Sequence, residues 1–204
     1  MLYRIRVGCP WRDLPKEFGL WNSIFKKFNA GSDQGKWIKL FGALVEEADM
    51  EWLFMDGSYI RDHQHCTGAS KESTEAIGKS RGGNTTKIHL SVDACGLPVG
   101  FEVTGGEVHD CTMAPVLLAK TPDVETVVAD RGYDSQPVRD PILKQKGKPV
   151  IPRKRNSVVG NRDIDWCLYK YRHLVENAFA RLKHFRGLAT RYDKLKRNFI
   201  SVVA

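Results

Sequence analysis

Apolar residues recur at every third or fourth position through the first 48 residues, and this spacing predicts helices. The first helix is expected to begin at Asn22 or Ser23, whose side chains suit an N-cap, and to break at residues 30–33. A second helix then carries Trp37, Leu40, Phe41 and Leu44. Two short helices around a glycine-containing turn are typical of a helix-turn-helix, and equally of an ordinary helical hairpin. No recognition-helix signature is present to decide between the two.

From residue 49 onwards the pattern becomes that of strands. Residues 52–55 and 127–129 are short apolar runs closed by an aspartate and a nearby glycine, as buried strands often are. Residues 85–92 and 99–103 alternate apolar and polar positions on either side of a turn, which predicts a β-hairpin. The remaining predicted elements are helices at 113–120, 137–145 and 168–185 and a brief strand at 150–151.

This order of elements predicts an α/β fold. It matches a ribonuclease-H-like mixed sheet with flanking helices, antiparallel on one side and joined by parallel crossovers on the other. We therefore expect a small helical region at residues 1–48, followed by one ribonuclease-H-like domain at residues 49–204. Residues 63–84 are polar and are expected to form a long loop. His63, His65 and Cys66 lie in that loop, but they make a weak metal site because no second cluster has matching spacing.

The net charge of +8 is unevenly distributed. Residues 51–138 carry seven Lys and Arg against 13 Asp and Glu, whereas residues 139–204 carry 17 against five. An acidic middle and a basic end suit a polyanion held beside a cation site, although a solvated basic surface would give the same count. No membrane-length apolar run, signal peptide or C-x-x-C pair is visible. We therefore expect a cytoplasmic protein whose five cysteines are reduced.

Three acids stand in settings that suggest one metal site. Asp56 and Asp130 each follow an apolar run directly, and ligands of open α/β sheets gather at the carboxyl ends of strands. Glu176 lies on the last predicted helix. Carboxylates in such positions are suited to hold divalent cations for phosphodiester chemistry. Taken singly, each acid also fits an ordinary turn or surface residue, and Asp110 and Asp134 are read as turn or capping residues.

The last helix places four polar residues in one stripe at the border of its apolar face. They are Tyr169, Arg172, Glu176 and Lys183. A border position suits an active site, because it is close to the core and still open to a substrate. Arg172 and Glu176 are also four residues apart, so a surface salt bridge is an equal alternative from helical geometry alone.

The spacing of these residues, Tyr169-x2-Arg172-x3-Glu176-x6-Lys183, matches the Y-R-E-K signature of insertion-sequence DDE transposases. Five further stretches resemble the family of bacterial insertion sequence five: Trp11-Arg12-Asp13-Leu14-Pro15, Asp56-Gly57-Ser58, Arg81-Gly82-Gly83, Thr85-Thr86-Lys87-Ile88-His89 and Ala129-Asp130-Arg131-Gly132-Tyr133-Asp134. The resemblance covers nearly the whole chain. It implies a ribonuclease-H-like core and an enzyme that cuts DNA and transfers strands with two Mg²⁺ ions, which Mn²⁺ can replace. The family's three acids correspond to Asp56, Asp130 and Glu176.

The resemblance also implies roles for the neighbouring residues. Asp56 would bridge the two ions, and each of the other two acids would bind one of them. Lys183 would hold a phosphate, Arg172 would steady Glu176 or contact the DNA backbone, and Tyr169 would stack on a base or bind a phosphate. Further DNA contacts are expected from basic side chains elsewhere: Arg81, Lys87, Arg131, Arg153, Lys154 and Arg155.

The expected partners are double-stranded DNA, as the terminal repeats of an insertion sequence and as its target, and a second copy of the chain in a dimer on DNA. Within the bacterial cytoplasm, we expect the protein at the nucleoid. Family members usually extend further at both ends, so both ends of this chain are expected to be short. Two alternatives follow: a truncated DNA-binding remnant without catalytic activity, and a metal-dependent nuclease of the same fold.

Overall fold

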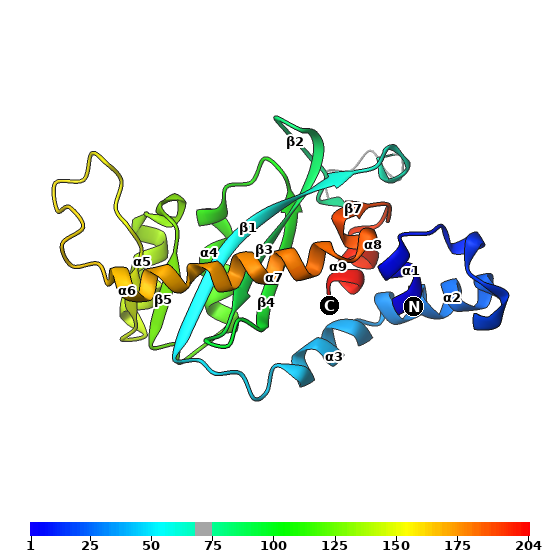
Figure 1. Cartoon of the computed structure of the whole chain (residues 1–204), viewed down its shortest axis with the longest axis horizontal. Helices are drawn as coiled ribbons and strands as arrows, with labels where there is room; N and C mark the ends of the chain where they lie inside the picture. Colours follow the sequence, from blue (N-terminus) through cyan, green and yellow to red (C-terminus); the bar gives the residue numbers. More distant parts are fainter. Residues whose placement is uncertain (68–74) are drawn as a thin grey trace.

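A mixed β-sheet forms the centre of the molecule, seen in a computed structural model that describes residues 1–67 and 75–204 (Figure 1). The long central strand β1 (Trp52–Asp62) pairs antiparallel with β3 (Gly83–Val92) and parallel with β5 (Thr126–Ala129). Its apolar start explains the parallel pairing, because strands of parallel sheets are covered on both faces. The sheet therefore changes from antiparallel to parallel at β1.

Shorter strands extend the sheet on both sides of this centre. Two of them pair antiparallel with β3, namely β2 (Gly78–Ser80) and β4 (Pro98–Gly105), and β6 (Lys148–Val150) pairs parallel with β5. The short β7 (Thr190–Arg191) pairs parallel with the last residues of β1. The sheet order is β4-β3-β1-β5-β6, in which the pairings β4–β3 and β3–β1 are antiparallel and β1–β5 and β5–β6 are parallel. This order confirms the predicted ribonuclease-H-like arrangement.

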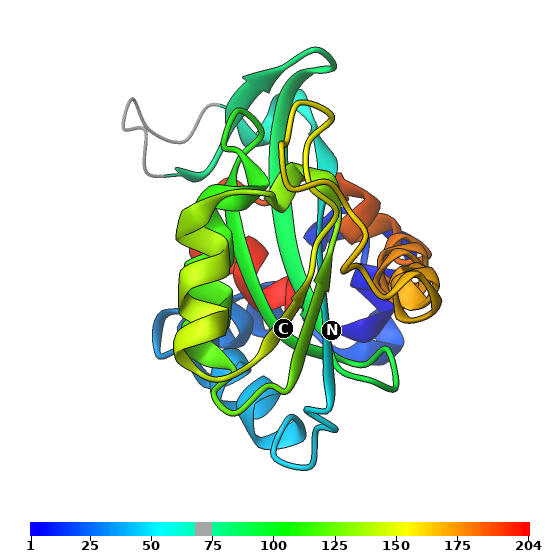
Figure 2. The ribbon, with the colours of Figure 1, turned by 90° about the vertical axis from the view of Figure 1, so that its left-hand side faces the viewer.

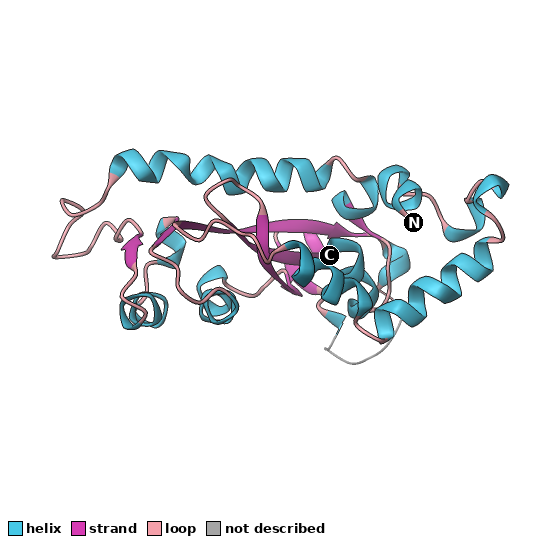
Figure 3. Ribbon diagram, turned by 90° about the horizontal axis from the view of Figure 1, so that it is seen from below, coloured by secondary structure: helices cyan, strands magenta, loops and turns pink. Residues whose placement is uncertain are grey.

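Helices cover both faces of the sheet, as Figures 2 and 3 show. One face is covered by α4 (Asp110–Lys120) and α5 (Gln136–Lys144), which pack on Leu53, Met55 and Val127. The other face is covered by one continuous helical run made of α6 (Trp166–Tyr169), the 3₁₀ turn η6 (Lys170–Arg172) and α7 (His173–Lys183). Successive residues of β1 therefore point alternately to the α4–α5 side, as Leu53 and Met55 do, and to the α7 side, as Phe54 does.

β1 is longer than the sequence predicted. The expected strand ended at Asp56, but pairing with β3 continues from Phe54 opposite Val92 to Arg61 opposite Thr85. The parallel partner β5 ends at Ala129, opposite Met55. Asp56 thus lies inside a strand, at the point where the parallel pairing stops and the antiparallel pairing goes on.

The N-terminal region is helical, as predicted, but its break lies later than residues 30–33. Helix α2 (Trp21–Asp33) runs through that segment and ends at Gln34 and Gly35, where Gly35 takes a positive φ of 64° before α3 (Lys36–Leu44) begins. The N-cap position is Leu20, so neither predicted cap residue serves as one. The remaining helical elements are α1 (Leu2–Val7), η1 (Trp11–Asp13), η2 (Lys16–Phe18), η3 (Gln64–Cys66), η5 (Arg131–Tyr133), α8 (Arg186–Ala189) and α9 (Lys196–Val203).

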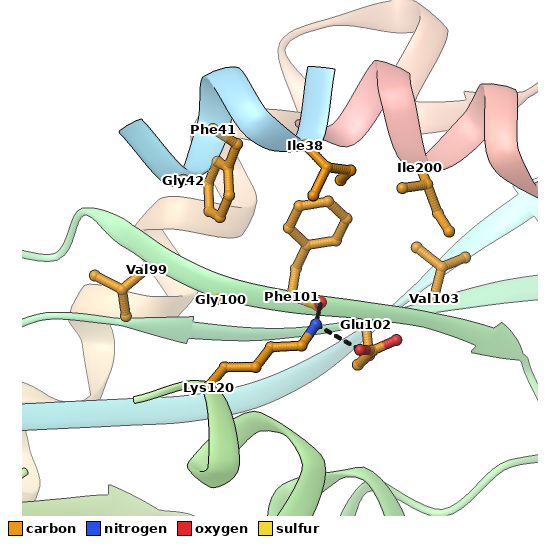
Figure 4. A pocket seen from close by; sticks show the side chains of 10 residues that line it. All are labelled: Ile38, Phe41, Gly42, Val99, Gly100, Phe101, Glu102, Val103, Lys120 and Ile200. Carbon is orange, nitrogen blue, oxygen red and sulfur yellow. Dashed lines mark hydrogen bonds and ion pairs between the residues drawn. The ribbon is translucent and has the colours of Figure 1, made fainter. Parts of the chain in front are cut away.

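Helices α2 and α3 pack against the rest of the molecule, although no residue of α3 is fully buried. Phe28 is fully buried in the same cluster as residues of α7, α9 and the sheet. Ile38 and Phe41 of α3 and Ile200 of α9 face Phe101 of β4 around a cavity of about 350 Å³ (Figure 4). None of the helices in the described part of the chain has the length and apolar character of a membrane span.

The polar stretch 63–84, predicted as one long loop, contains regular structure where it is described. It holds η3, β2 and the start of β3, while residues 68–74 lie outside the described residues. Cys66 is buried, and burial raises the pKa of its thiol to about 11. A thiolate is therefore disfavoured there, which argues against a metal site with His63 and His65.

Candidate active site

The strand register brings Asp56 and Asp130 to neighbouring positions. Met55 of β1 lies opposite Ala129 of β5, and one further step along both strands leads to Asp56 and Asp130. Adjacent strands are about 4.8 Å apart, so the two carboxylates leave the sheet close to one another. Each accepts a hydrogen bond from a nearby glycine N–H, Asp56 Oδ1 from Gly57 and Asp130 Oδ1 from Gly132, both at 2.8 Å. These local bonds fix the carboxylates beside their own backbone.

Arg172 connects Asp56 to Glu176. Its Nη1 donates to Asp56 Oδ2 at 3.0 Å, and its Nη2 makes a short contact with Glu176 Oε1, one helical turn further along. Asp56 is two residues beyond Phe54 and so points to the same face of the sheet, which α7 covers. Asp56 and Arg172, far apart in sequence, therefore meet there. The helical stripe predicted from the sequence thus lies against the strand that carries Asp56.

Burial and charge act in opposite directions on this cluster. Burial raises the pKa of Asp56, whereas the Gly57 N–H and Arg172 lower it. Repulsion from Asp130 and Asp110 raises it further, and the net shift is upward. Burial lowers the pKa of Arg172, but the carboxylates of Glu176, Asp56 and Asp130 outweigh burial and raise it. Three acids thus act electrostatically on one guanidinium.

The other two residues of the signature lie on the same helical run. Lys183 Nζ donates to Ser58 Oγ at 2.6 Å, and Ser58 is two residues beyond Asp56 on the same face of β1. Tyr169 is partly buried and packs edge-on against Trp166, with 5.5 Å between the ring centroids. The ammonium of Lys183 therefore marks one end of the polar stripe, and the Tyr169 phenol marks the other.

A second polar cluster lies behind Asp56, on the opposite face of β1. A Cβ atom added to Gly57 would meet Asp110 Oδ1 at 2.0 Å, so this glycine makes room for the carboxylate at the start of α4. Asp110 Oδ1 is 3.3 Å from Lys87 Nζ and 3.2 Å from Nδ1 of the fully buried His89. The N-cap of α4 is His109, and the Asp110 carboxylate pairs with Lys87 and His89, so its predicted turn or capping role is corrected to that of a charge partner.

This cluster also corrects one predicted DNA contact. The Lys87 side chain is only 4% exposed, and its ammonium donates to the carbonyl of Val108 at 2.8 Å. Lys87 therefore has no free surface for a phosphate. The cluster was not predicted from the sequence, although the alternation along β3 indicated it. Lys87 and His89 point to the face of the sheet that α4 covers, and Ile88 points to the other face.

The remaining predicted DNA contacts are at the surface. Arg81, Arg131, Lys154 and Arg155 are exposed. Arg153 is the exception, because its guanidinium forms a two-point ion pair with Asp163, at 2.5 and 2.7 Å. Asp134, predicted as a turn or capping residue, accepts hydrogen bonds from Arg139 and from the backbone N–H of Lys154.

The chemistry of the acids fits a divalent cation. Among the described residues, no three His, Cys, Asp or Glu side chains lie close enough to hold a metal ion, and Arg172 lies between Asp56 and Glu176. The guanidinium is itself a cation, and its contacts with two carboxylates define a position that favours positive charge. An all-oxygen set of carboxylates suits Mg²⁺ or Mn²⁺ better than softer metals.

Comparison with known proteins decides the family. A family model described as "Transposase DDE domain" matches residues 47–204, which include all three acids. The chain belongs to this family. A second model, for transposases of the IS4/5 family, matches residues 1–41. The two matches agree with the resemblance to insertion sequence five.

Individual relatives agree with the family. A Brucella ovis protein described as a transposase for insertion sequence element IS6501 is 39% identical over 122 residues, covering 58% of this chain and 92% of the relative. A Burkholderia cepacia protein described as a transposase for element IS402 is 31% identical over 138 residues, covering 62% of each chain. Among solved structures, the catalytic domain of Mos1 mariner transposase aligns with a TM-score of 0.35 and 11% identity, covering 87% of this chain and 84% of that one.

Membership of the family gives the general activity. The family match and the curated relatives support the function of a DNA transposase.

Proposed function

We propose that Asp56, Asp130 and Glu176 are the catalytic acids of this transposase and together hold two divalent cations, Mg²⁺ or in its place Mn²⁺. The observation that carries this proposal is the position of Arg172. Its guanidinium contacts Asp56 and Glu176, and the negative charges of all three acids raise the pKa of Arg172. A single cationic group among three carboxylates, one of them half-buried with a raised pKa, is what an acid cluster needs in order to avoid mutual repulsion.

The chain's own residues would orient the DNA around these acids. Bound cations supply activation of water and of a DNA 3′-hydroxyl, and they stabilise the departing oxygen. Once the carboxylates have other cationic partners, Arg172 is available to donate both of its N–H pairs to a backbone phosphate. Lys183, beside Ser58, would hold a second phosphate, and Tyr169 would contact a base or the backbone at the other end of the stripe. No covalent enzyme–DNA intermediate is required.

The substrates proposed for this site are the terminal repeats of an insertion sequence and a target duplex. We propose that two copies of the chain act together, one on each end of the element, and that the protein works at the bacterial nucleoid. Exposed basic residues near the acids, Arg131, Lys154 and Arg155, would contact phosphates on either side of the scissile bond.

Plasmid nicking tests the assignment of the acids. Purified parent protein is incubated with supercoiled plasmid in Mg²⁺ or in EDTA, beside Asp56→Asn, Asp130→Asn and Glu176→Gln. Each substitution keeps the side-chain size and removes the charge that holds a cation, so nicking should fall by orders of magnitude while the folded structure and DNA affinity are kept. Glu125→Gln is the matched control, because this exposed acid lies directly before β5, at the opposite end of the strand from Asp130.

The results separate the alternatives. Calorimetric titration with Mn²⁺ gives a second readout, in which the three variants but not Glu125→Gln should bind more weakly. If Glu176→Gln nicks DNA as well as the parent does, the three-acid site is wrong. A parent that binds DNA and never nicks it would be the inactive remnant. A parent that nicks DNA but never joins a 3′-hydroxyl end to a second duplex would be a nuclease of the same fold.

A further inference from the structure

The loop between β6 and α6 is closed at its base by hydrogen bonds and an ion pair. We call residues 153–163 the arm. Arg153 pairs with Asp163 at the base of the arm, donates from Nη1 to the carbonyl of Gly160 at 2.9 Å, and donates from its backbone N–H to Asn161 Oδ1 at 2.6 Å. The hydrogen bond from Arg153 lowers the pKa of Asp163 to about 2, so the ion pair between these two residues stays charged through the physiological pH range. These bonds close the base of the arm and leave its other residues outside the core.

Two valines form the tip of this arm. Val158 is 101% exposed and Val159 is 70% exposed, and Val158 is the most exposed of the large apolar side chains in the described part of the chain. Large apolar side chains that project fully into water have no packing role in the free protein. Neighbouring positions in the arm are basic: Lys154, Arg155 and Arg162 are all exposed. The tip is therefore apolar and its surroundings are cationic.

The arm leaves the sheet at the edge where the acids lie. β6 runs parallel to β5, so the chain after Val150 emerges on the same side as Asp130. The base of the arm is fixed there by the bond from the Lys154 N–H to Asp134 Oδ2 at 2.8 Å, four residues after Asp130. The arm then leads directly into α6, which carries Tyr169. In Figure 1 it is the yellow loop that projects from the molecule beside α6.

We propose that the arm is a DNA wedge: Lys154, Arg155 and Arg162 contact the phosphates of a duplex held at the acid site, and Val158 and Val159 enter its groove and partly unstack one base step. This inference rests on the proposed function. DNA is the partner that matches both properties of the arm, because its backbone is anionic and its base steps accept apolar side chains once they are opened. Unstacking a base step has a free-energy cost, and burial of the two valines offsets part of that cost.

The test compares Val158→Ser/Val159→Ser with the parent on a duplex oligonucleotide that carries 2-aminopurine at successive positions. Unstacking increases the fluorescence of 2-aminopurine, so the parent should show an increase at one or two adjacent positions and the double variant should show none. Affinity for the duplex should fall about tenfold, while the dependence of affinity on salt stays the same because the phosphate contacts remain. Leu143→Ser is the matched control: Leu143 is 55% exposed and stands beside Lys144, but lies at the end of α5, on the opposite edge of the sheet.

Several results would overturn the wedge. A double variant that keeps the parent's fluorescence change excludes unstacking by the valines, and so does a parent that gives no fluorescence change on bound duplex. Vesicles containing phosphatidylglycerol are a second probe; if only vesicle binding is lost in the double variant, the arm is a membrane contact instead. A parent that nicks plasmid while the valine substitutions change nothing leaves the acid site intact and removes only the wedge. Failure of the parent to bind DNA at all would remove both.

Discussion

At the scale of single residues, Gly57 separates two charged clusters on opposite faces of one strand. Gly57→Ala would place a methyl group 2.0 Å from Asp110 Oδ1, and Asp110 is short and tied to Lys87 and His89, so it cannot move freely. We expect a loss of about 1–3 kcal/mol in the free energy of unfolding, measured by urea denaturation. Gly42→Ala, in α3 with nothing within 4 Å of the added atom, should instead stabilise the protein by about 0.5–1 kcal/mol.

A double variant tests the cause of that loss. Asp110→Ala removes the carboxylate that Gly57→Ala would meet, so the two substitutions together should cost less than the sum of their separate costs. Additive costs would mean that the methyl group clashes with something other than Asp110.

Asp56 illustrates the conflict between stability and function in an active site. Burial, with repulsion from Asp130 and Asp110, raises its pKa despite the Gly57 N–H and Arg172. A carboxyl group whose pKa is higher in the folded state makes the protein lose stability as pH rises above its ordinary value of 3.8. In EDTA at pH 7, Asp56→Asn should therefore melt about 1–3 °C above the parent, and the difference should vanish below pH 3.8.

The same variant should respond differently to metal. Added Mg²⁺ should raise the melting temperature of the parent, because a ligand of the folded state stabilises it, and should have little effect on Asp56→Asn. An Asp56→Asn protein that melts below the parent in EDTA would mean that the ion pair with Arg172 outweighs the cost of burial.

At the scale of elements, the sequence predicted the strands and helices well and their ends poorly. Alternation along residues 85–92 predicted β3, and the stripe on the last helix predicted which residues would share its polar border. The end of β1 could not be predicted, because Asp56-Gly57 is a common turn pair and only the pairing with β3 keeps it extended to Asp62. Residues 30–33 stay helical because Gly31 packs under Trp37 and Ser32 Oγ bonds to the Phe28 carbonyl.

The site was predicted in part for the same reason. Motif spacing gave the three acids as candidates, and the register of β1 with β5 places two of them at neighbouring positions. Spacing alone does not predict that Arg172 reaches Asp56, 116 residues away in sequence, because that contact depends on how α7 packs on the sheet. The burial of Lys87 was missed because a lysine on a strand was taken as exposed, while α4 and Asp110 cover its face.

Asp134 joins three elements, and it gives a pH prediction opposite in sign to that of Asp56. Burial raises its pKa, but hydrogen bonds from the Lys154 N–H and from Arg139 outweigh burial and lower it. A lowered pKa contributes stability above the ordinary value of 3.8, and this contribution is lost as pH falls through the folded-state value. Asp134→Asn should cost about 1–2 kcal/mol at pH 6 by urea denaturation. At pH 2–3 the two proteins should converge; a difference that is constant with pH would rule out the charge as the cause.

At the scale of the whole molecule, the N-terminal helices and the catalytic sheet share a hydrophobic cluster. Phe28 of α2, Phe101 of β4 and Phe179 of α7 all belong to it, and Phe41 of α3 packs edge-on against Phe101 with 5.3 Å between the ring centroids. Such sharing couples the stability of residues 1–44 to that of the sheet. It also fixes where the basic surface can lie, because Phe28 of α2 is buried and Phe41 of α3 packs against the sheet.

The distribution of positive charge decides which surface binds DNA. Residues 139–204 carry 17 Lys and Arg against five Asp and Glu, and some of these basic residues lie in the segments at the two ends of β6. Lys154, Arg155 and Arg162 are on the edge with the acids, whereas Lys144, Lys146 and Lys148 are exposed on the opposite edge. If DNA lies across the acids, only the first group neutralises phosphates. Two triple Gln variants, one for each group, remove the same net charge and so separate local contact from the general field of the protein.

Binding of each triple variant to a duplex is then measured over a range of salt concentrations. Each phosphate contact contributes about −0.9 to the slope of log K against log[salt], so the variant at Lys154, Arg155 and Arg162 should lose about 2.7 units of slope. The variant at Lys144, Lys146 and Lys148 should keep the slope of the parent and lose affinity only slightly, since charges beyond about 10 Å are screened at 0.1 M salt. Equal losses of slope in both variants would mean that the duplex binds the basic surface without preference for the acid edge, and the position proposed for DNA would then be wrong.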